Sequence, residues 1–146
     1  KFKGLLTTGN IKGEKIYAIK PLTFMNNSGI CIRELLEYFK FDAKDVIVFH
    51  DDLDIEFGKI KAKFGGSSAG HNGIASIDKF IGKDYSRVRI GIGKPKTPIG
   101  IKDYVLQNFD EDELAGIDKI SENITESIED LIKKKLDLFS SIINNK

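Results

Sequence analysis

Three short clusters of polar residues carry side chains that suit acid–base chemistry. They are Thr23-Phe24-Met25-Asn26, His50-Asp51-Asp52-Leu53-Asp54 and Gly70-His71-Asn72-Gly73. An imidazole can act as a base near neutral pH, a carboxylate can orient it, and an asparagine amide offers both a donor and an acceptor. Each cluster follows a predicted strand or opens a predicted helix. Because ligands of open α/β sheets bind outside the carboxyl ends of strands, we expect the clusters to converge in one crevice.

Two of the clusters also have a purely structural interpretation. Asn26 and Asn72 are both good helix caps, since a short amide side chain can accept a hydrogen bond from the first turn.

The glycine-rich segment at residues 65–70 could cradle a phosphate. It lacks the Gly-Lys-Ser/Thr ending of a nucleotide-binding loop and the Gly-x-Gly-x-x-Gly turn of a dinucleotide-binding fold.

The acidic cluster allows two kinds of chemistry. His50, Asp51 and Asp54 could bind a divalent cation in a metal-dependent hydrolase, although no second His or Glu follows at metalloprotease spacing. Asp51 could instead orient a histidine that another segment supplies, as in a catalytic triad. The single cysteine, Cys31, has no neighbouring base and falls inside a predicted helix, which favours a buried structural thiol over a nucleophile.

The elements that must position these clusters alternate between strand and helix. A turn at residues 9–13 separates the first two strands, so we expect a hairpin. The apolar residues of the first helix are spaced by three or four, and a continuous apolar run indicates a strand buried on both faces. The predicted strands are residues 2–7, 14–20, 46–49, 59–64 and 87–92, and the predicted helices begin at 28 and cover 72–81 and 110–136. This order favours an α/β fold with a mixed sheet.

Two of the strands alternate in polarity. In residues 59–64 the alternation puts the lysines on one face. In residues 87–92 it directs Val88, Ile90 and Ile92 toward the core and directs Arg87 and Arg89 away from it.

Composition and charge narrow the class of protein. The chain has 146 residues with 40% hydrophobic and 31% charged residues, which excludes a wholly disordered or collagen-like chain. No apolar run reaches the roughly 18 residues that span a bilayer. One cysteine excludes an internal disulfide framework, and we expect a cytoplasmic protein. Ten basic and two acidic residues lie between Gly58 and Lys102, a stretch that could attract phosphate or nucleic acid.

The three clusters, in this order and spacing, closely resemble the bacterial-type peptidyl-tRNA hydrolase family. The segment Arg87-Val88-Arg89-Ile90-Gly91-Ile92-Gly93 and the acidic helix after it extend the resemblance over nearly the whole chain. One departure is Ala75, where the family usually carries a basic residue. The resemblance implies a three-layer α/β/α fold with a mixed, mostly parallel central sheet. We therefore expect a single domain over residues 1–146, with an amphipathic carboxy-terminal helix at residues 110–136.

The resemblance also implies an activity and a set of residue roles. These enzymes hydrolyse the ester bond between a peptide and the terminal ribose of tRNA. By resemblance, Asp51 holds the catalytic histidine, Met25 shapes the wall near the ester, and Lys63 and Arg89 meet tRNA phosphate. The residues expected to act in catalysis are Asp51, Asn26 and Asn72, and those expected to bind substrate are Phe24, Met25, Asn26, Lys63, His71, Asn72 and Arg89.

Elementary ester chemistry is consistent with these residue types. A histidine can activate water, the carboxylate behind it stabilises the imidazolium, and Asn26 or Asn72 can hold the water or the oxyanion. The reaction then needs no metal or cofactor. Lysines and arginines would supply salt-sensitive affinity for the RNA backbone. We expect a monomer that acts on peptidyl-tRNA without a membrane or an obligate protein partner. The alternative is a non-catalytic RNA-binding relative on the same fold.

The resemblance does not extend to the segment with which the family begins. That segment holds a strand, a glycine-asparagine-proline turn and an Arg-His-Asn motif that carries the catalytic histidine. The chain contains two histidines, His50 and His71, and both match other family positions. We therefore expect the chain to be amino-terminally incomplete, without the family's first strand and helix, and to hydrolyse little substrate by itself.

Overall fold

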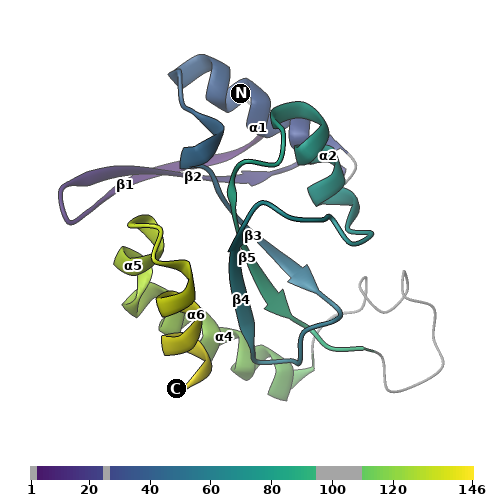
Figure 1. The fold of residues 1–146 in the computed structure, drawn as a ribbon, viewed down its shortest axis with the longest axis vertical. Coiled ribbons are helices and arrows are strands. Elements are labelled where there is room, and N and C mark those ends of the chain that lie inside the picture. Colours follow the sequence, from purple (N-terminus) through teal and green to yellow (C-terminus); the bar gives the residue numbers. More distant parts are fainter. Residues whose placement is uncertain (1–2, 25–26, 95–109) are drawn as a thin grey trace. The chain divides into compact units, whose positions relative to one another are not determined.

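Strands and helices alternate along the chain, as the sequence predicts for an α/β protein. The structure, a computed structural model, describes residues 3–24, 27–94 and 110–146. Its elements are β1 (Gly4–Ile11), β2 (Glu14–Pro21), α1 (Ser28–Phe39), η2 (Ala43–Asp45), β3 (Ile47–Asp52), β4 (Ile60–Phe64), α2 (Asn72–Ile81), β5 (Ser86–Gly91), α4 (Glu111–Glu126), α5 (Ile128–Ile132) and α6 (Leu136–Asn144). Figure 1 labels the helices and strands of this order other than η2. The predicted α/β class is confirmed.

The chain divides into two compact units. The first unit contains Lys1–Val48 and Lys63–Arg87, and the second contains Phe49–Ala62 and Val88–Lys146. The strands form a two-stranded sheet of β1 and β2 and a three-stranded sheet in the order β3-β5-β4. Each strand of the larger sheet has residues in both units.

The predicted hairpin is confirmed, and its first strand runs further than expected. β1 and β2 pair antiparallel from Gly4 opposite Pro21 to Ile11 opposite Glu14. The two residues between them, Lys12 and Gly13, have φ values of 51° and 87°. Two successive positive φ values define the type I′ turn that matches the twist of paired strands.

Helices α1 and α2 pack closely in the first unit because Gly29 has no side chain. A Cβ atom at Gly29 would lie 2.2 Å from the backbone oxygen of Ser76, which is closer than any real contact. The Gly29 N–H donates to the hydroxyl of Ser76 at 2.9 Å. Ile32 of α1 shares a buried cluster with Ile74 and Ile77 of α2. The apolar faces predicted for both helices are therefore confirmed.

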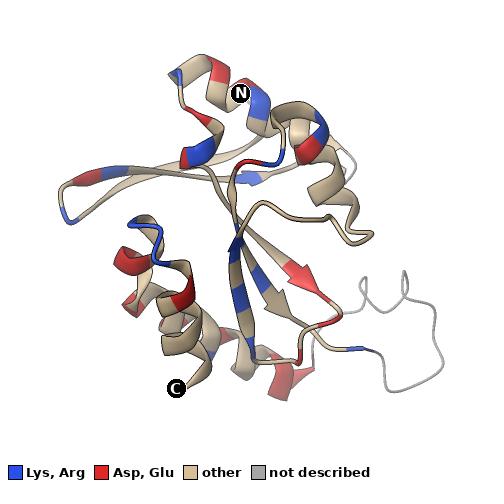
Figure 2. Ribbon diagram, viewed as in Figure 1, with Lys and Arg blue, Asp and Glu red and all other residues tan. Residues whose placement is uncertain are grey.

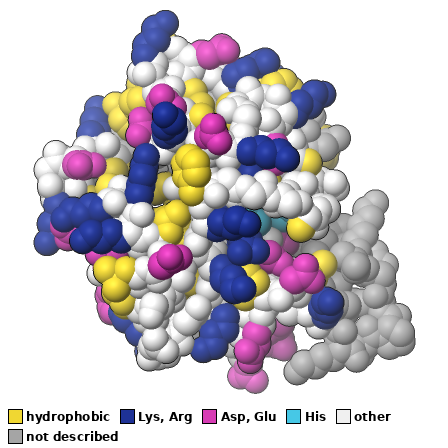
Figure 3. Space-filling model, viewed as in Figure 1, with side chains coloured by type: hydrophobic (Ala, Val, Ile, Leu, Met, Phe, Trp, Pro, Cys, Tyr) yellow, Lys and Arg dark blue, Asp and Glu magenta, His cyan; other side chains and the backbone are white. Residues whose placement is uncertain are grey.

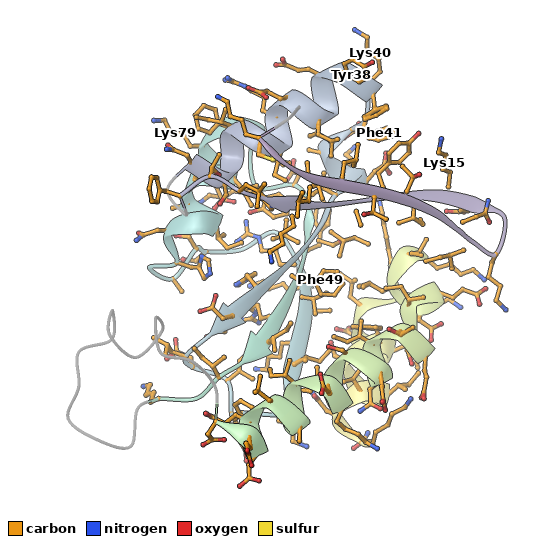
Figure 4. The ribbon with its side chains drawn as sticks, turned by 180° about the vertical axis from the view of Figure 1, so that it is seen from behind. Lys15, Tyr38, Lys40, Phe41, Phe49 and Lys79 are labelled. Atoms are coloured by element: carbon orange, nitrogen blue, oxygen red, sulfur yellow. The ribbon has the colours of Figure 1, made fainter. Side chains whose placement is uncertain are left out.

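Aromatic residues join β2 to the end of α1 in the same unit. The ring of Tyr17 lies 4.7 Å from that of Phe39 and 5.0 Å from that of Phe41, between centroids. Tyr38 and Phe41, labelled in Figure 4, are 58% and 36% exposed, so the outer side of this cluster faces solvent.

Strand β5 lies between two partners, and this position corrects one prediction. Arg87 is 2% exposed, so the expectation that it points away from the core is wrong. When a strand has a neighbour on each edge and packing on each face, neither of its two alternating sets of side chains is fully exposed to water. Arg87 donates from Nη2 to Asp78 at 2.9 Å, and the Tyr85 hydroxyl donates to the same carboxylate oxygen at 2.7 Å. The buried cation is thus matched by a carboxylate of α2.

The two outer strands of this sheet differ in burial. In β4, Ile60 and Ala62 are buried while Lys61 and Lys63 are exposed, which confirms the predicted alternation. In β3, Phe49 is 45% exposed (Figure 4), so burial on both faces is not observed. β3 has one sheet neighbour in the described structure, β5, and an edge strand is covered less completely than a central one.

The carboxy-terminal helix begins as predicted but ends earlier. Asp110 and Glu113 form a capping box, in which each side chain accepts from the other residue's backbone N–H. The predicted helix over 110–136 is divided at Ser127 and again at Lys133–Lys135, which gives α4, α5 and α6. Lys134 adopts a φ of 61°, a left-handed conformation that ends a helix. No helix among the described residues is long and apolar enough to cross a membrane.

Helix α6 occupies the outer edge of β4 in the second unit. The Asn144 side chain accepts from the Ile60 N–H and donates to the Ile60 carbonyl, both at 2.9 Å. The Ser140 hydroxyl accepts from the Ala62 N–H at 2.8 Å. An open strand edge exposes unpaired backbone groups, and these two side chains satisfy them in place of another strand.

We predict that Asn144→Ala lowers the free energy of unfolding by about 2 kcal/mol, because it leaves both backbone groups of Ile60 without a partner. Asn145→Ala is the matched control, since the neighbouring Asn145 is exposed. It should change stability by less than about 0.5 kcal/mol. Urea denaturation followed by circular dichroism measures both values, and equal losses would contradict the edge-covering role.

We further predict an alkaline loss of stability that depends on Tyr85. Burial, followed by the hydrogen bond to Asp78, raises the pKa of Tyr85 above its ordinary value of 10.0. The folded state therefore holds this proton more tightly than the unfolded state, and the free energy of unfolding falls as the pH rises above about 10. In Tyr85→Phe this part of the decline disappears. Urea denaturation between about pH 8 and pH 11 measures it, with the exposed Tyr38→Phe as control.

Candidate active site

The first turn of α2 carries the most complete of the predicted clusters. His71 is the N-cap residue, and its Nδ1 accepts from the Ile74 N–H at 3.2 Å. Asn72 is the first helical residue and is exposed. The structure therefore assigns the cap to His71 rather than to Asn72. The roles expected for the Asn72 amide in catalysis and substrate binding remain predictions.

Lys63 lies against the glycine-rich loop that leads into α2. A Cβ atom added to Gly66 would lie 3.0 Å from both Cε and Nζ of Lys63, so the lysine side chain runs over the loop. Its ammonium group therefore lies beside Gly66, within the first unit. Figure 2 shows basic residues along β4 and β5, and Figure 3 shows Lys and Arg side chains at the surface in the same view.

The first predicted cluster is only partly described. Phe24 is 84% exposed, and its carbonyl accepts from the Asn27 N–H at 2.8 Å just before α1. Met25 and Asn26 lie outside the described residues, so their expected roles remain predictions. The role expected for the Phe24 ring in binding substrate remains a prediction.

The acidic cluster lies at the end of β3 in the second unit. Asp51 and Asp52 are partly buried, and the ring Nδ1 of His50 lies 2.9 Å from the Asp51 carbonyl oxygen. Asp52 accepts from the Asp54 N–H at 2.8 Å and forms an ion pair with Arg89 at 3.7 Å. Part of the charge of Arg89 is therefore compensated within the protein. Its expected contact with tRNA phosphate remains a prediction.

The two catalytic positions that the structure describes belong to different units. Asp51 lies in the second unit and Asn72 in the first. Their expected convergence stays a prediction. In the described part of the chain, no three His, Cys, Asp or Glu side chains group so as to hold a metal ion.

Two further groups with reactive or charged side chains are buried: the thiol of Cys31 and the pair of Arg87 and Asp78. Cys31 is fully buried in α1, as expected for a structural thiol, and burial, together with the charge of Glu34, raises the pKa of its thiol. A raised pKa reduces the thiolate fraction and hence the reactivity. The sequence analysis does not predict the buried pair of Arg87 and Asp78.

The feature of the sequence that could have indicated this pair is Asp78, a single acidic residue beside the apolar positions of residues 72–81.

We predict that His71→Ala lowers the free energy of unfolding by about 1 kcal/mol, because it removes the cap of α2. His71→Asn keeps a side-chain acceptor and should retain most of that stability. Asn72→Ala is the neighbouring control and should change stability by less than about 0.5 kcal/mol. Thermal or urea denaturation of the three variants checks the assignment, and a larger loss in Asn72→Ala would reverse it.

The chain matches known proteins over its whole length. The family model for peptidyl-tRNA hydrolase matches residues 1–146. A peptidyl-tRNA hydrolase of Pelagibacter ubique is 75% identical over 146 residues, which are 100% of this chain and 78% of that protein. One from Wolbachia sp. subsp. Drosophila simulans is 48% identical over 122 residues, 82% of this chain and 67% of that protein.

A solved structure has the same fold. The crystal structure of peptidyl-tRNA hydrolase from Acinetobacter baumannii superposes with a TM-score of 0.88 at 29% identity, covering 98% of this chain and 73% of that one. This similarity supports the predicted three-layer α/β/α fold. With the family match over residues 1–146, it follows that the chain belongs to the peptidyl-tRNA hydrolase family and to its class of enzymes.

Proposed function

We propose that this protein hydrolyses the ester bond between a peptide and the terminal ribose of tRNA, releasing free tRNA and peptide. The observation that carries the proposal is the match of the family across residues 1–146, together with 75% identity to a curated peptidyl-tRNA hydrolase. The family match also supports treating residues 1–146 as one peptidyl-tRNA hydrolase-like domain.

In the proposed reaction, a histidine removes a proton from water and the oxygen attacks the carbonyl carbon of the ester. The acyl–oxygen bond then breaks, and the ribose oxygen leaves with the proton. The family places this histidine in an Arg-His-Asn motif, which residues 1–146 do not contain. We assign Asp51 to hold and orient it, because a partly buried carboxylate stabilises the imidazolium.

The amide of Asn72 holds the water or the oxyanion in this proposal, as does that of Asn26. For Asn72 the supporting observations are its exposure at the first turn of α2 and the assignment of the cap to His71. His71 then contributes to the substrate site mainly by fixing this turn. Preorganised donors act most strongly when they are held before the charge develops.

The exposed ring of Phe24 suits stacking on the terminal adenine, and we place Met25 beside it near the ester. Lys63 and Arg89 are proposed to contact tRNA phosphates. Such contacts are insensitive to sequence and weaken as salt rises. The reaction proposed here uses no cofactor. We also propose that the protein is cytoplasmic, where its substrate is made, and monomeric.

We predict that Asp51→Asn and Asn72→Ala each lower kcat on a peptidyl-tRNA about a hundredfold in the full-length protein, because each removes a group that acts in the transition state. Release of labelled peptide from purified peptidyl-tRNA measures the rate. Asp54→Asn and Asn145→Ala are the matched controls, since both residues are exposed.

Both controls should keep nearly the wild-type rate. Wild-type activity of Asp51→Asn or of Asn72→Ala would refute the assigned role of that residue. Absence of hydrolysis by the wild-type full-length protein, with retained tRNA binding, would refute the proposed function itself.

A further inference from the structure

The loop that precedes Asn72 has a backbone that needs external support. Of its six residues, Gly65, Gly66, Ala69 and Gly70 have positive φ values of 70°, 107°, 47° and 82°. Glycine loses more conformational freedom on folding than any other residue, so such a loop has many alternative conformations. Ala69 adopts its left-handed conformation at a cost that the surroundings must offset.

Contacts inside and outside the loop hold this conformation. Within the loop, the Ala69 N–H donates to the Ser67 hydroxyl at 3.0 Å, and the His71 N–H donates to the Ser68 carbonyl at 2.9 Å. From outside, the Tyr85 carbonyl accepts from the Gly65 N–H at 2.9 Å. Arg87 donates from Nη1 to the Ser67 carbonyl at 3.1 Å. Arg87 thus donates a hydrogen bond to the middle of the loop, while Lys63 lies against Gly66.

The same guanidinium also binds the helix that follows the loop. Its second terminal nitrogen donates to Asp78 at 2.9 Å, and its Cζ lies 4.6 Å from the centre of the Tyr85 ring. Ser67 comes five residues before Asn72, and Asp78 comes six residues after it. One rigid planar group therefore holds the chain on both sides of the first turn of α2.

This bridge depends on the shape of the guanidinium and not on its charge alone. A lysine ammonium could pair with Asp78, but it is a point charge without the fixed fork that spans two acceptors. Neutralising the buried charge requires the carboxylate of Asp78. The contact with the Ser67 carbonyl is additional, and its consequence is to fix the loop.

We propose that Arg87 is a positioning residue, which sets the place of the Asn72 amide by tying the Ser67 carbonyl of the loop to Asp78 of α2. This inference rests on the proposed function of Asn72. A displacement of about 1 Å at a catalytic group can cost on the order of a hundredfold in rate, so the loss of one tie is expected to be measurable.

The first test is Arg87→Lys in the full-length protein, which keeps the charge but cannot span both acceptors. We expect kcat on peptidyl-tRNA to fall at least about tenfold, with a smaller change in KM. Arg33→Lys is the matched control, because Arg33 is a partly exposed arginine of α1 in the same unit. It should keep the wild-type kcat. An unchanged kcat in Arg87→Lys would overturn the proposal.

The second test asks whether Arg87 acts through Asn72. In the Asn72→Ala background, Arg87→Lys should lower kcat by less than about threefold further, because the group that it positions is gone. If the two losses multiply fully, Arg87 acts by general destabilisation and the proposal is wrong. Tyr85→Phe, which leaves the contact between Arg87 and Ser67 in place, provides a destabilised variant for comparison.

A third measurement is independent of activity. Hydrogen exchange of the His71 amide, which is bonded to Ser68, should be at least about tenfold faster in Arg87→Lys than in Tyr85→Phe. Equal exchange would overturn the proposal. If Arg87→Lys fails to fold, Asp78→Asn tests the same tie from the helix side with the same readouts. Full activity of Asn72→Ala would instead refute the role proposed for Asn72, and the exchange rates would then decide the role of Arg87 alone.

Discussion

A guanidinium that is buried from water is stable only where its charge is matched, and Arg87 imposes this condition on the first unit. Asp78 supplies the matching carboxylate, and Tyr85 donates a second hydrogen bond to it. Removing one member of such a pair costs about 3–5 kcal/mol, because the other charge stays buried without compensation. The start of β5, the middle of α2 and the loop before α2 are therefore held in one mutual arrangement.

Features set by local periodicity could be predicted from the sequence. The bounds of α2, the alternation in β4 and the N-cap of α4 at Asp110 all follow from spacing and capping within a few residues. The hairpin itself is as predicted, but its turn lies at Lys12 and Gly13, and the expected turn residues Gly9 and Asn10 belong to β1. Each is a property of neighbouring residues, and tertiary packing reinforces it. The burial of Arg87 and the exposure of Phe49 depend instead on the strand order β3-β5-β4, which no local pattern encodes.

The candidate site shows the same limit at the scale of single residues. The segment Gly70–Gly73 was recognised as a loop entering a helix, but the choice of His71 rather than Asn72 as the cap depends on one backbone conformation. The division of the carboxy-terminal helix at Ser127 also escaped prediction, because the apolar spacing continues across it. Short ordered motifs identified the family, whereas the roles of Asp51 and Asn72 come from that family and not from spacing.

Two of the basic residues between Gly58 and Lys102 have less charge to offer an RNA than the sequence suggests, because acidic residues of the protein pair with them. Arg87 is buried against Asp78, and Arg89 is paired in part with Asp52. Neither offers a full free charge to a phosphate. The exposed lysines of β4 are two residues apart on the strand, and the side chain of Lys63 lies over the loop that leads to Asn72. Under the proposed function, we expect the lysines of β4 to contribute more to binding of an RNA backbone than Arg87 and Arg89, because a cation that is already paired inside the protein has less charge to offer a phosphate.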